Sequence, residues 1–294
     1  TPPPPRRRAP STAGGRRTVF VSSGMLRLEA HDDVTRLQLS SAASRIAGYA
    51  VSAYAVPLDD GRRVLVDTGF PGVRRALVAW VTAERRAGRP IVGAIVTHRH
   101  EDHAGNVEAL ARLGLPLLMG EATRRSVEAV GAIGLYRHVT WGQMPSLRTR
   151  VPTLDAAPLV LVPTPGHSSD HHAVWDPRTR TLFGGDLFLG VKVRIAHPGE
   201  DPRALARSLR AAAALAPVRL FDAHRGLVRD PVPLLLAKAA WIDETVGAIE
   251  RLLAAGWPER RIRQRVLGRE GLAGYVSRGD YSRLNFVRAV RRGG

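Results

Sequence analysis

The pattern of apolar and polar positions changes several times along the chain. Alternating or apolar stretches predict strands over residues 34–40, 49–56 and 62–69, with a DDG turn sequence at 59–61 before the third. Because these connections are short, we expect an antiparallel start to the fold. Residues 72–86 instead repeat apolar side chains every three to four positions, which predicts a helix.

The same alternation continues downstream. The apolar run IVGAIVTH at 91–98 is typical of a strand covered on both faces. Asp201 and Pro202 are suited to begin a helix, as N-cap and first helical residue. Residues 131–157 carry scattered glycines and prolines and are predicted to be irregular. The remaining predicted strands are 116–120, 158–164, 172–176, 181–185 and, as the last strand, 218–224; the remaining predicted helices are 106–113, 121–130, 201–214, a segment from Pro231 onward, 258–267 and 281–292.

This order divides the chain into three predicted parts. Residues 1–17 are rich in proline and arginine without apolar periodicity, so we expect a disordered tail. Residues 18–230 mix strands and helices and are predicted to form one α/β domain. Residues 231–294 are predicted to form a C-terminal helical extension.

Composition narrows the picture. The 294 residues carry a net charge of +18, and Lys192 and Lys238 are the only lysines. The arginines concentrate at both ends, where they could attract a polyanion, so nucleic acid is kept as a less favoured partner. The absence of cysteine excludes disulfides and thiolate metal sites. Neither a membrane-spanning apolar stretch nor a secretory apolar region is present, so we expect a cytoplasmic protein without membrane contact.

Candidate chemistry is densest at residues 97–106, THRHEDHAGN, directly after the apolar run. In an extended segment, His98 and His100 project to the same side and could grip one ion. Asp102 and His103 lie where the chain turns into the next helix and could face a second ion. Imidazole and carboxylate ligands suit zinc, and also manganese or iron.

The segment HRHEDH resembles the H-x-H-x-D-H signature of the metallo-β-lactamase superfamily, and the resemblance extends in order along the chain. The matching segments are LVDTG at 65–69, PTPGHSSDHH at 163–172, LFGGDLF at 182–188 and FDAHRG at 221–226. An ordered set is far more specific than one short motif. The resemblance implies a four-layer αββα sandwich in which residues 18–230 are the catalytic domain.

The resemblance also implies a site. The first of two divalent metal ions, most plausibly zinc, would be bound by His98, His100 and His167. The second would be bound by Asp102, His103 and His224, with Asp186 bridging both. Asp67 and His171 are expected to position ligands from behind, and Asp102 to take or relay a proton during catalysis.

The implied activity is hydrolysis of a small ester, thioester or lactone by a hydroxide that both ions activate. A bridging Asp186 is more similar to glyoxalase II-like and lactamase-β-like branches than to true β-lactamases. The HAGN sequence at 103–106 departs from glyoxalase II, which argues against glutathione as the thiol carrier. Two alternatives remain: an endoribonuclease acting on single-stranded RNA, and a catalytically silent binding protein. The oligomeric state is open.

Other histidines lack partners at ligand spacing, so we expect His31, His138 and His197 to be ordinary surface or core residues. Glu101, within the motif, is expected to point to solvent.

Overall fold

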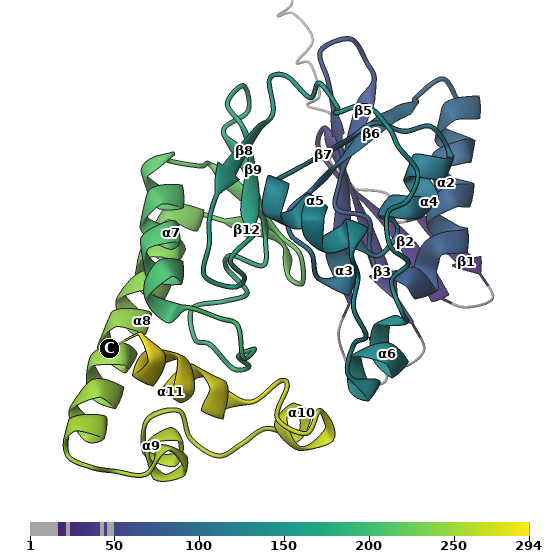
Figure 1. Cartoon of the computed structure of the whole chain (residues 1–294). Helices are drawn as coiled ribbons and strands as arrows, with labels where there is room; N and C mark the ends of the chain where they lie inside the picture. Colours follow the sequence, from purple (N-terminus) through teal and green to yellow (C-terminus); the bar gives the residue numbers. More distant parts are fainter. Residues whose placement is uncertain (1–16, 22–23, 42–43, 46–49, 294) are drawn as a thin grey trace, which may run out of the picture.

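The structure is a computed structural model that describes residues 17–21, 24–41, 44–45 and 50–293. It contains two β-sheets packed face to face with helices on both outer sides (Figure 1). The predicted α/β sandwich of four layers is confirmed. The predicted tail lies outside the described residues except for Arg17, which begins the first strand.

The first sheet contains seven strands in sequence order. Its first five strands pair antiparallel, as expected from their short connections, and the last three pair parallel. The strands are β1 (Arg17–Val21), β2 (Gly24–His31), β3 (Val34–Ser40), β4 (Val51–Pro57), β5 (Arg63–Val66), β6 (Ile91–Val96) and β7 (Leu117–Met119).

The second sheet has five strands in the order β12-β11-β10-β9-β8. Within it, β10 and β11 run parallel, whereas the other neighbours are antiparallel. The strands are β8 (Val160–Pro163), β9 (His172–Asp176), β10 (Thr181–Gly185), β11 (Arg219–Asp222) and β12 (Gly226–Arg229).

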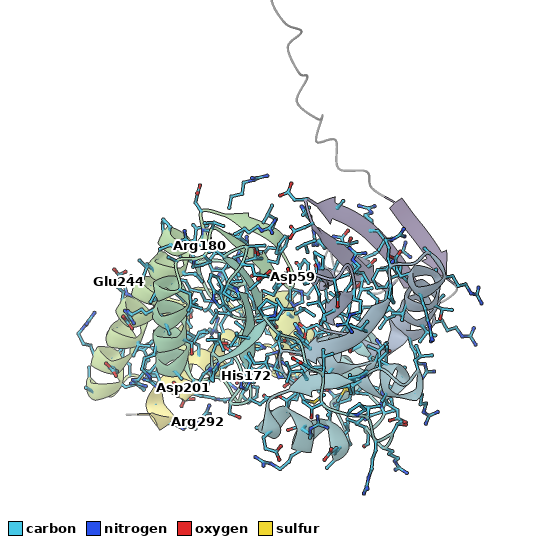
Figure 2. The ribbon with its side chains drawn as sticks, turned by 90° about the horizontal axis from the view of Figure 1, so that it is seen from above. Asp59, His172, Arg180, Asp201, Glu244 and Arg292 are labelled. Atoms are coloured by element: carbon cyan, nitrogen blue, oxygen red, sulfur yellow. The ribbon has the colours of Figure 1, made fainter. Side chains whose placement is uncertain are left out.

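Helices cover both sheets. Helices α2 and α4 lie outside the first sheet, and α7 and α8 lie outside the second; side chains fill the space between the layers (Figures 1 and 2). The helices are η1 (Pro71–Val73), α2 (Arg74–Arg86), α3 (Glu101–Ala104), α4 (Val107–Arg112), α5 (Glu121–Glu128), α6 (Leu135–Trp141), α7 (Pro202–Ala214), α8 (Pro231–Ala254), α9 (Glu259–Val266), α10 (Leu272–Val276) and α11 (Arg283–Arg292).

Three apolar clusters hold these layers together. One lies between the first sheet and its helices, and another between the second sheet and α7, α8 and α11. The third lies between the two sheets, where Tyr54, Phe183 and Phe221 pack against one another. Burial on both faces explains why the central strands are apolar throughout rather than alternating.

Several elements differ from the sequence prediction. Strands β1 and β2 and helix α10 were not predicted. Helix α6 lies inside the stretch predicted to be irregular, because Gly134 and Gly142 flank the helix instead of interrupting it. Strand β12 follows the predicted last strand, since Gly226 adopts a positive φ of 75° at the start of a tight return. The predicted cap is confirmed: Asp201 accepts hydrogen bonds from the backbone N–H groups of Arg203 and Ala204.

That residues 231–294 form a separate C-terminal extension remains a prediction. Its first helix, α8, packs along α7, and Leu235, Ile242 and Ile249 join the core beneath the second sheet. Among the described residues, no helix is both long and apolar enough to cross a membrane. The cytoplasmic location also remains a prediction.

Candidate metal centre

The chemically significant side chains meet at one edge of the sandwich, where strands of both sheets end. Asp67 follows β5, the motif loop follows β6, Asp186 follows β10 and His224 follows β11. Since the paired strands β5–β6 and β10–β11 each run parallel, their carboxyl ends lie at the same edge of each sheet. His167 comes from the loop between β8 and β9.

The motif loop turns sharply at Gly105, whose backbone has an ordinary right-handed helical conformation. Glycine is needed here because there is no room for a Cβ atom, and not because the backbone conformation is unusual. A Cβ at this position would lie 2.3 Å from the carbonyl oxygen of Glu101 and 2.6 Å from that of Gly69. This close approach brings the 98–103 loop against the Asp67 loop.

All seven sequence-predicted ligands converge in two groups. In the first group, His100 Nδ1 lies 3.0 Å from His98 Nε2 and 3.1 Å from His167 Nε2. His167 Nε2 also lies 3.3 Å from Asp186 Oδ2. We call the seven residues the ligand cage: His98, His100, Asp102, His103, His167, Asp186 and His224.

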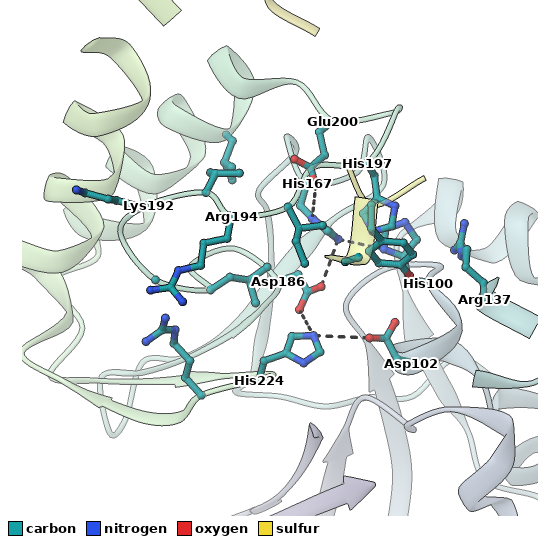
Figure 3. Close-up of a pocket in the computed structure, with 18 of the residues that line it drawn as sticks. His100, Asp102, Arg137, His167, Asp186, Lys192, Arg194, His197, Glu200 and His224 are labelled. Carbon is teal, nitrogen blue, oxygen red and sulfur yellow. Dashed lines mark hydrogen bonds and ion pairs between the residues drawn. The ribbon is translucent and has the colours of Figure 1, made fainter. Parts of the chain in front are cut away.

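The second group uses the other carboxylate oxygen of Asp186. Asp186 Oδ1 lies 3.3 Å from His103 Nε2 and 3.4 Å from His224 Nε2. Asp102 Oδ2 lies 3.6 Å from His224 Nε2 and 3.8 Å from His103 Nε2. Asp186 therefore faces both groups, one oxygen to each (Figure 3).

These spacings fit metal ions. Ligands about 2.0–2.1 Å from a tetrahedral zinc ion lie about 3.3–3.4 Å from one another. Neighbouring donor atoms within the two groups lie 3.0–3.8 Å apart, close to that spacing. In addition, the buried atoms His103 Nε2 and Asp186 Oδ1 have no hydrogen-bond partner within the described residues. Buried polar atoms without partners are costly, and an ion between them would satisfy both.

In four of the five ligand histidines, the ring nitrogen that points away from the group also has a partner. His103 Nδ1 lies 2.8 Å from Asp67 Oδ2, and His224 Nδ1 lies 3.0 Å from the carbonyl oxygen of Ala50. Neither oxygen can donate, so each Nδ1–H donates and each Nε2 keeps a lone pair for the ion side. This arrangement is typical of metal-binding histidines.

The first group is oriented in the same way. His98 Nδ1 donates to Thr97 Oγ1 at 3.0 Å, and that hydroxyl in turn donates to Asp67. His167 Nδ1 lies 3.2 Å from Glu200 Oε1. The carboxylate of Asp67 thus contacts His103 directly and His98 through Thr97, one histidine of each group.

Asp67 adopts a left-handed backbone conformation with φ of 61°. This conformation is uncommon for a residue with a Cβ, although Asp tolerates it better than most. Thr97 N–H donates to Asp67 Oδ1 at 2.9 Å, which helps to hold the side chain toward the cage. Such local strain is concentrated at functional sites.

His171 lies directly behind Asp186. Its Nε2 accepts a hydrogen bond from the Asp186 backbone N–H at 3.1 Å, so the ring proton resides on Nδ1 and is donated to Thr164 Oγ1. Burial, reinforced by the nearby charge of His167, lowers the pKa of His171 to about 3. The neutral ring positions the Asp186 backbone.

Protonation follows the local charges. Burial disfavours charged His224, but Asp186 and Asp102 outweigh it and raise the pKa of His224 to about 9. The same balance raises the pKa of His103 well above its ordinary value. Burial and neighbouring histidines hold the pKa of His98 well below the ordinary value. Without an ion, the carboxylates therefore favour a proton on Nε2 of His103 and of His224, and a bound ion would replace that proton and use the lone pair.

Three further residues reach the site without a sequence signal. Glu200 supports His167 from the loop before α7. The ring of His197, expected to be ordinary, lies 5.3 Å from that of His100 and 4.3 Å from that of Tyr281. Tyr281 belongs to the C-terminal extension, and its hydroxyl oxygen accepts a hydrogen bond from Trp141 Nε1 at 3.4 Å.

Glu101 was placed wrongly by the sequence prediction. It is only 5% exposed and forms an ion pair with Arg137 of α6. The prediction failed because α6, which supplies this arginine, was itself missed. His31 and His138 lie outside the cage and the cavity, as expected.

A cavity of about 780 Å³ opens beside the cage. His100, Asp102, His167, Asp186 and His224 form its floor. Its walls come from the loop after β10, from α6 and from the C-terminal extension, including α10 and Tyr281. This volume is in the range typical of small-molecule sites.

Comparisons with known proteins show similarity to proteins of one metal-binding superfamily. Residues 46–122 match the family model described as metallo-beta-lactamase superfamily. A beta-lactamase-like protein 2 homolog from Caenorhabditis elegans is 29% identical over 207 residues, 66% of this chain and 65% of that protein. This chain therefore spans slightly less than two thirds of that relative's length.

Two other matches are informative. An atrochrysone carboxyl ACP thioesterase from Aspergillus fumigatus is 32% identical over 130 residues, 44% of this chain and 37% of that protein. A metallo-beta-lactamase from Pseudomonas aeruginosa, solved in its mono-zinc form, superposes with a TM-score of 0.57 at 18% identity. It covers 73% of this chain and 95% of its own. The second likeness concerns the fold.

The two-sheet sandwich thus brings two His/Asp groups that could hold metal ions to one edge. Residues 46–122 match the metallo-β-lactamase superfamily model, the Caenorhabditis elegans relative is similar over a longer part of the chain, and the solved structure has the same fold.

Proposed function

We propose that the protein is a metal-dependent hydrolase that cleaves a small ester, thioester or lactone. The observation that carries the proposal is the position of Asp186, which directs one carboxylate oxygen to each ligand group. A shared carboxylate between two groups is suited to a pair of ions. The thioesterase among the relatives supports an acyl substrate.

The cage fits two zinc ions because its donors are imidazole nitrogens and carboxylate oxygens, although manganese or iron would accept the same ligands. Ions bound there would polarise a substrate carbonyl and lower the pKa of water. His98, His100 and His167 would hold the first ion. Asp102, His103 and His224 would hold the second, and Asp186 would contribute to both positions.

Asp102 has a further role in this proposal. Its carboxylate lines the cavity, so it can reach substrate as well as its own group. A carboxylate at this place can accept a proton from the attacking water and pass it to the departing group. His171, Asp67 and Glu200 move no proton; they fix the orientation of the cage.

A second candidate is cleavage of single-stranded RNA. Several basic side chains line the same cavity, and they would attract a phosphodiester as well as another anion. A silent binding protein on this fold is a weaker candidate because the ligand cage is intact.

The test combines metal analysis with a substrate panel. Purified protein supplied with zinc should bind about two equivalents and hydrolyse at least one thioester, ester or lactone. The Asp186→Ala variant should lose about 10³-fold or more in kcat/KM, since removing the shared ligand costs several kcal/mol of transition-state stabilisation. Circular dichroism should show an unchanged fold.

Asp243→Ala is the matched control, because Asp243 is a surface aspartate of α8 that pairs with Arg210. It should retain full turnover. Absence of bound metal, or undiminished turnover in Asp186→Ala, would overturn the proposal. Turnover of RNA in place of every acyl substrate would favour the second candidate.

A further inference from the structure

The cavity beside the cage has two chemically different surfaces beyond its floor. The loop after β10 contributes Lys192, Arg194 and Ile195, and α10 contributes Leu272 and Val276. We call these five residues, together with Arg225, the outer wall. These six residues line the cavity without belonging to the cage.

Basic side chains of the outer wall are not neutralised within the protein. Among the described residues, no carboxylate forms an ion pair with Lys192, Arg194 or Arg225, and all three are exposed. The cavity's other cations differ: Arg137 pairs with Glu101, and Lys238 donates to the carbonyl oxygens of Leu187 and Phe188.

The cations are also unevenly placed. Lys192 and Arg194 lie on one side of Asp186, whereas Arg137 lies beyond His100 on the other side (Figure 3). The carboxylates that line the cavity are Asp102, Asp186 and Glu200, all committed to the cage or its support. The outer wall therefore has an excess of positive charge that is available to an anionic ligand.

An apolar surface accompanies this charge. Leu272 is 79% exposed, Val276 is 55% exposed and Ile195 is 43% exposed, yet all three line the cavity. Apolar side chains grouped at the mouth of a cavity are typical of a ligand-binding surface. They offer little to a sugar–phosphate backbone but can cover a hydrocarbon chain.

We infer that the substrate is an acyl thioester with an apolar acyl chain and a leaving portion that carries negative charge. This inference rests on the proposed function and names the substrate class. The charged portion lies against Lys192, Arg194 and Arg225. The acyl chain lies against Ile195, Leu272 and Val276. The thioester carbonyl between them faces the cage.

The reaction is a plain hydrolysis. Water adds its oxygen to the acyl carbon, the carbon–sulfur bond breaks, and the sulfur leaves with the bonding electron pair and takes up a proton. The products are a carboxylic acid and a thiol. No redox partner is required.

The first experiment compares two thioesters of one acyl group with zinc-loaded protein. Octanoyl-coenzyme A carries phosphates, whereas octanoyl-N-acetylcysteamine has the same scissile bond and no charge. We expect the charged thioester to have a KM lower by about tenfold at low salt, because three weakly screened cations contribute. Raising the salt concentration should remove much of this difference.

The second experiment assigns the charge to residues. In the triple variant Lys192→Gln, Arg194→Gln, Arg225→Gln, KM for octanoyl-coenzyme A should rise by about tenfold. KM for the uncharged octanoyl-N-acetylcysteamine should not change. Arg260→Gln is the matched control, since Arg260 is exposed on α9 and does not line the cavity.

The third experiment tests the apolar surface. In Leu272→Ser with Val276→Ser, KM for the octanoyl thioesters should rise about tenfold, and KM for the acetyl thioesters should not change, because only a long chain reaches this surface. Tyr275→Ser is the control: Tyr275 is 70% exposed on the same short helix but does not line the cavity.

The outcomes separate this inference from the proposed function. Equal hydrolysis of charged and uncharged, long and short thioesters would overturn the inference and leave the hydrolase intact. Hydrolysis of none of the acyl substrates by metal-loaded protein would defeat the proposed function itself. Cleavage of single-stranded RNA that the triple variant abolishes would assign the cations to a nucleic acid and also overturn the inference.

Discussion

The ligand cage and the outer wall lie side by side in one cavity but are built on opposite principles. Cage residues follow strand ends, are mostly buried, and have partners behind them, as His103 has in Asp67 and His167 has in Glu200. Wall residues lie on two loops and a five-residue helix and are exposed. The cage is therefore suited to determine the reaction. Substitutions in the wall can change which substrate binds without disturbing the metal ligands.

The largest effect should come from weakening the support of the cage. Asp67→Asn keeps the size of the side chain and tolerates the left-handed backbone, but it replaces a carboxylate oxygen with an NH2 group. We expect metal affinity to fall about 10- to 100-fold. Competition with a chromophoric chelator measures this. Unchanged affinity would mean that His103 needs no carboxylate partner.

A smaller effect is expected at Glu200, which supports one ligand only. Glu200→Ala should weaken metal binding about tenfold, because His167 loses its acceptor. Glu200→Gln should restore most of that affinity, since an amide oxygen can still accept from His167 Nδ1. If both variants bind metal equally poorly, the negative charge matters rather than the hydrogen bond.

Tyr281 lies where the cage and the wall meet, and its substitution should separate the two. Tyr281→Ala removes the ring that packs against His197 and should raise KM about two- to tenfold with unchanged metal content. Tyr281→Phe keeps the ring and should behave nearly as the wild type. A loss of metal in Tyr281→Ala would show that the extension supports the cage directly.

The smallest effect on activity should come from Glu108, which belongs to neither region. Despite the cost of burial, hydrogen bonds from the Arg148 and Thr149 backbone lower its pKa from 4.5 to about 2. Glu108→Gln should reduce the free energy of unfolding by about 1–3 kcal/mol and leave kcat/KM unchanged.

The pH dependence of this effect has a definite sign. A carboxyl whose pKa is lowered on folding stabilises the protein above its ordinary pKa, and the contribution is lost as pH falls toward 2. Urea unfolding of the wild type and Glu108→Gln should therefore differ most near pH 6 and converge in acid. A constant difference would exclude the charge as the cause.

The sequence predicted the cage better than the residues around it for a physical reason. Each cage residue lies in a short local pattern, such as HRHEDH or LFGGDLF, and the order of these patterns along the chain makes them recognisable. Glu200, His197 and Tyr281 approach the cage only through packing of loops and the C-terminal extension, which no local pattern records. Missing α6 also misplaced Glu101, because its partner Arg137 lies on that helix.

Neither half of the molecule contains a complete binding position. His98, His100, Asp102 and His103 belong to the first half, whereas His167, Asp186 and His224 belong to the second. Ions bound there would link the two halves, and metal affinity would therefore depend on how tightly the two halves pack against each other. Any substitution that loosens the packing between the sheets should consequently show up as weaker metal binding, even far from the ligands.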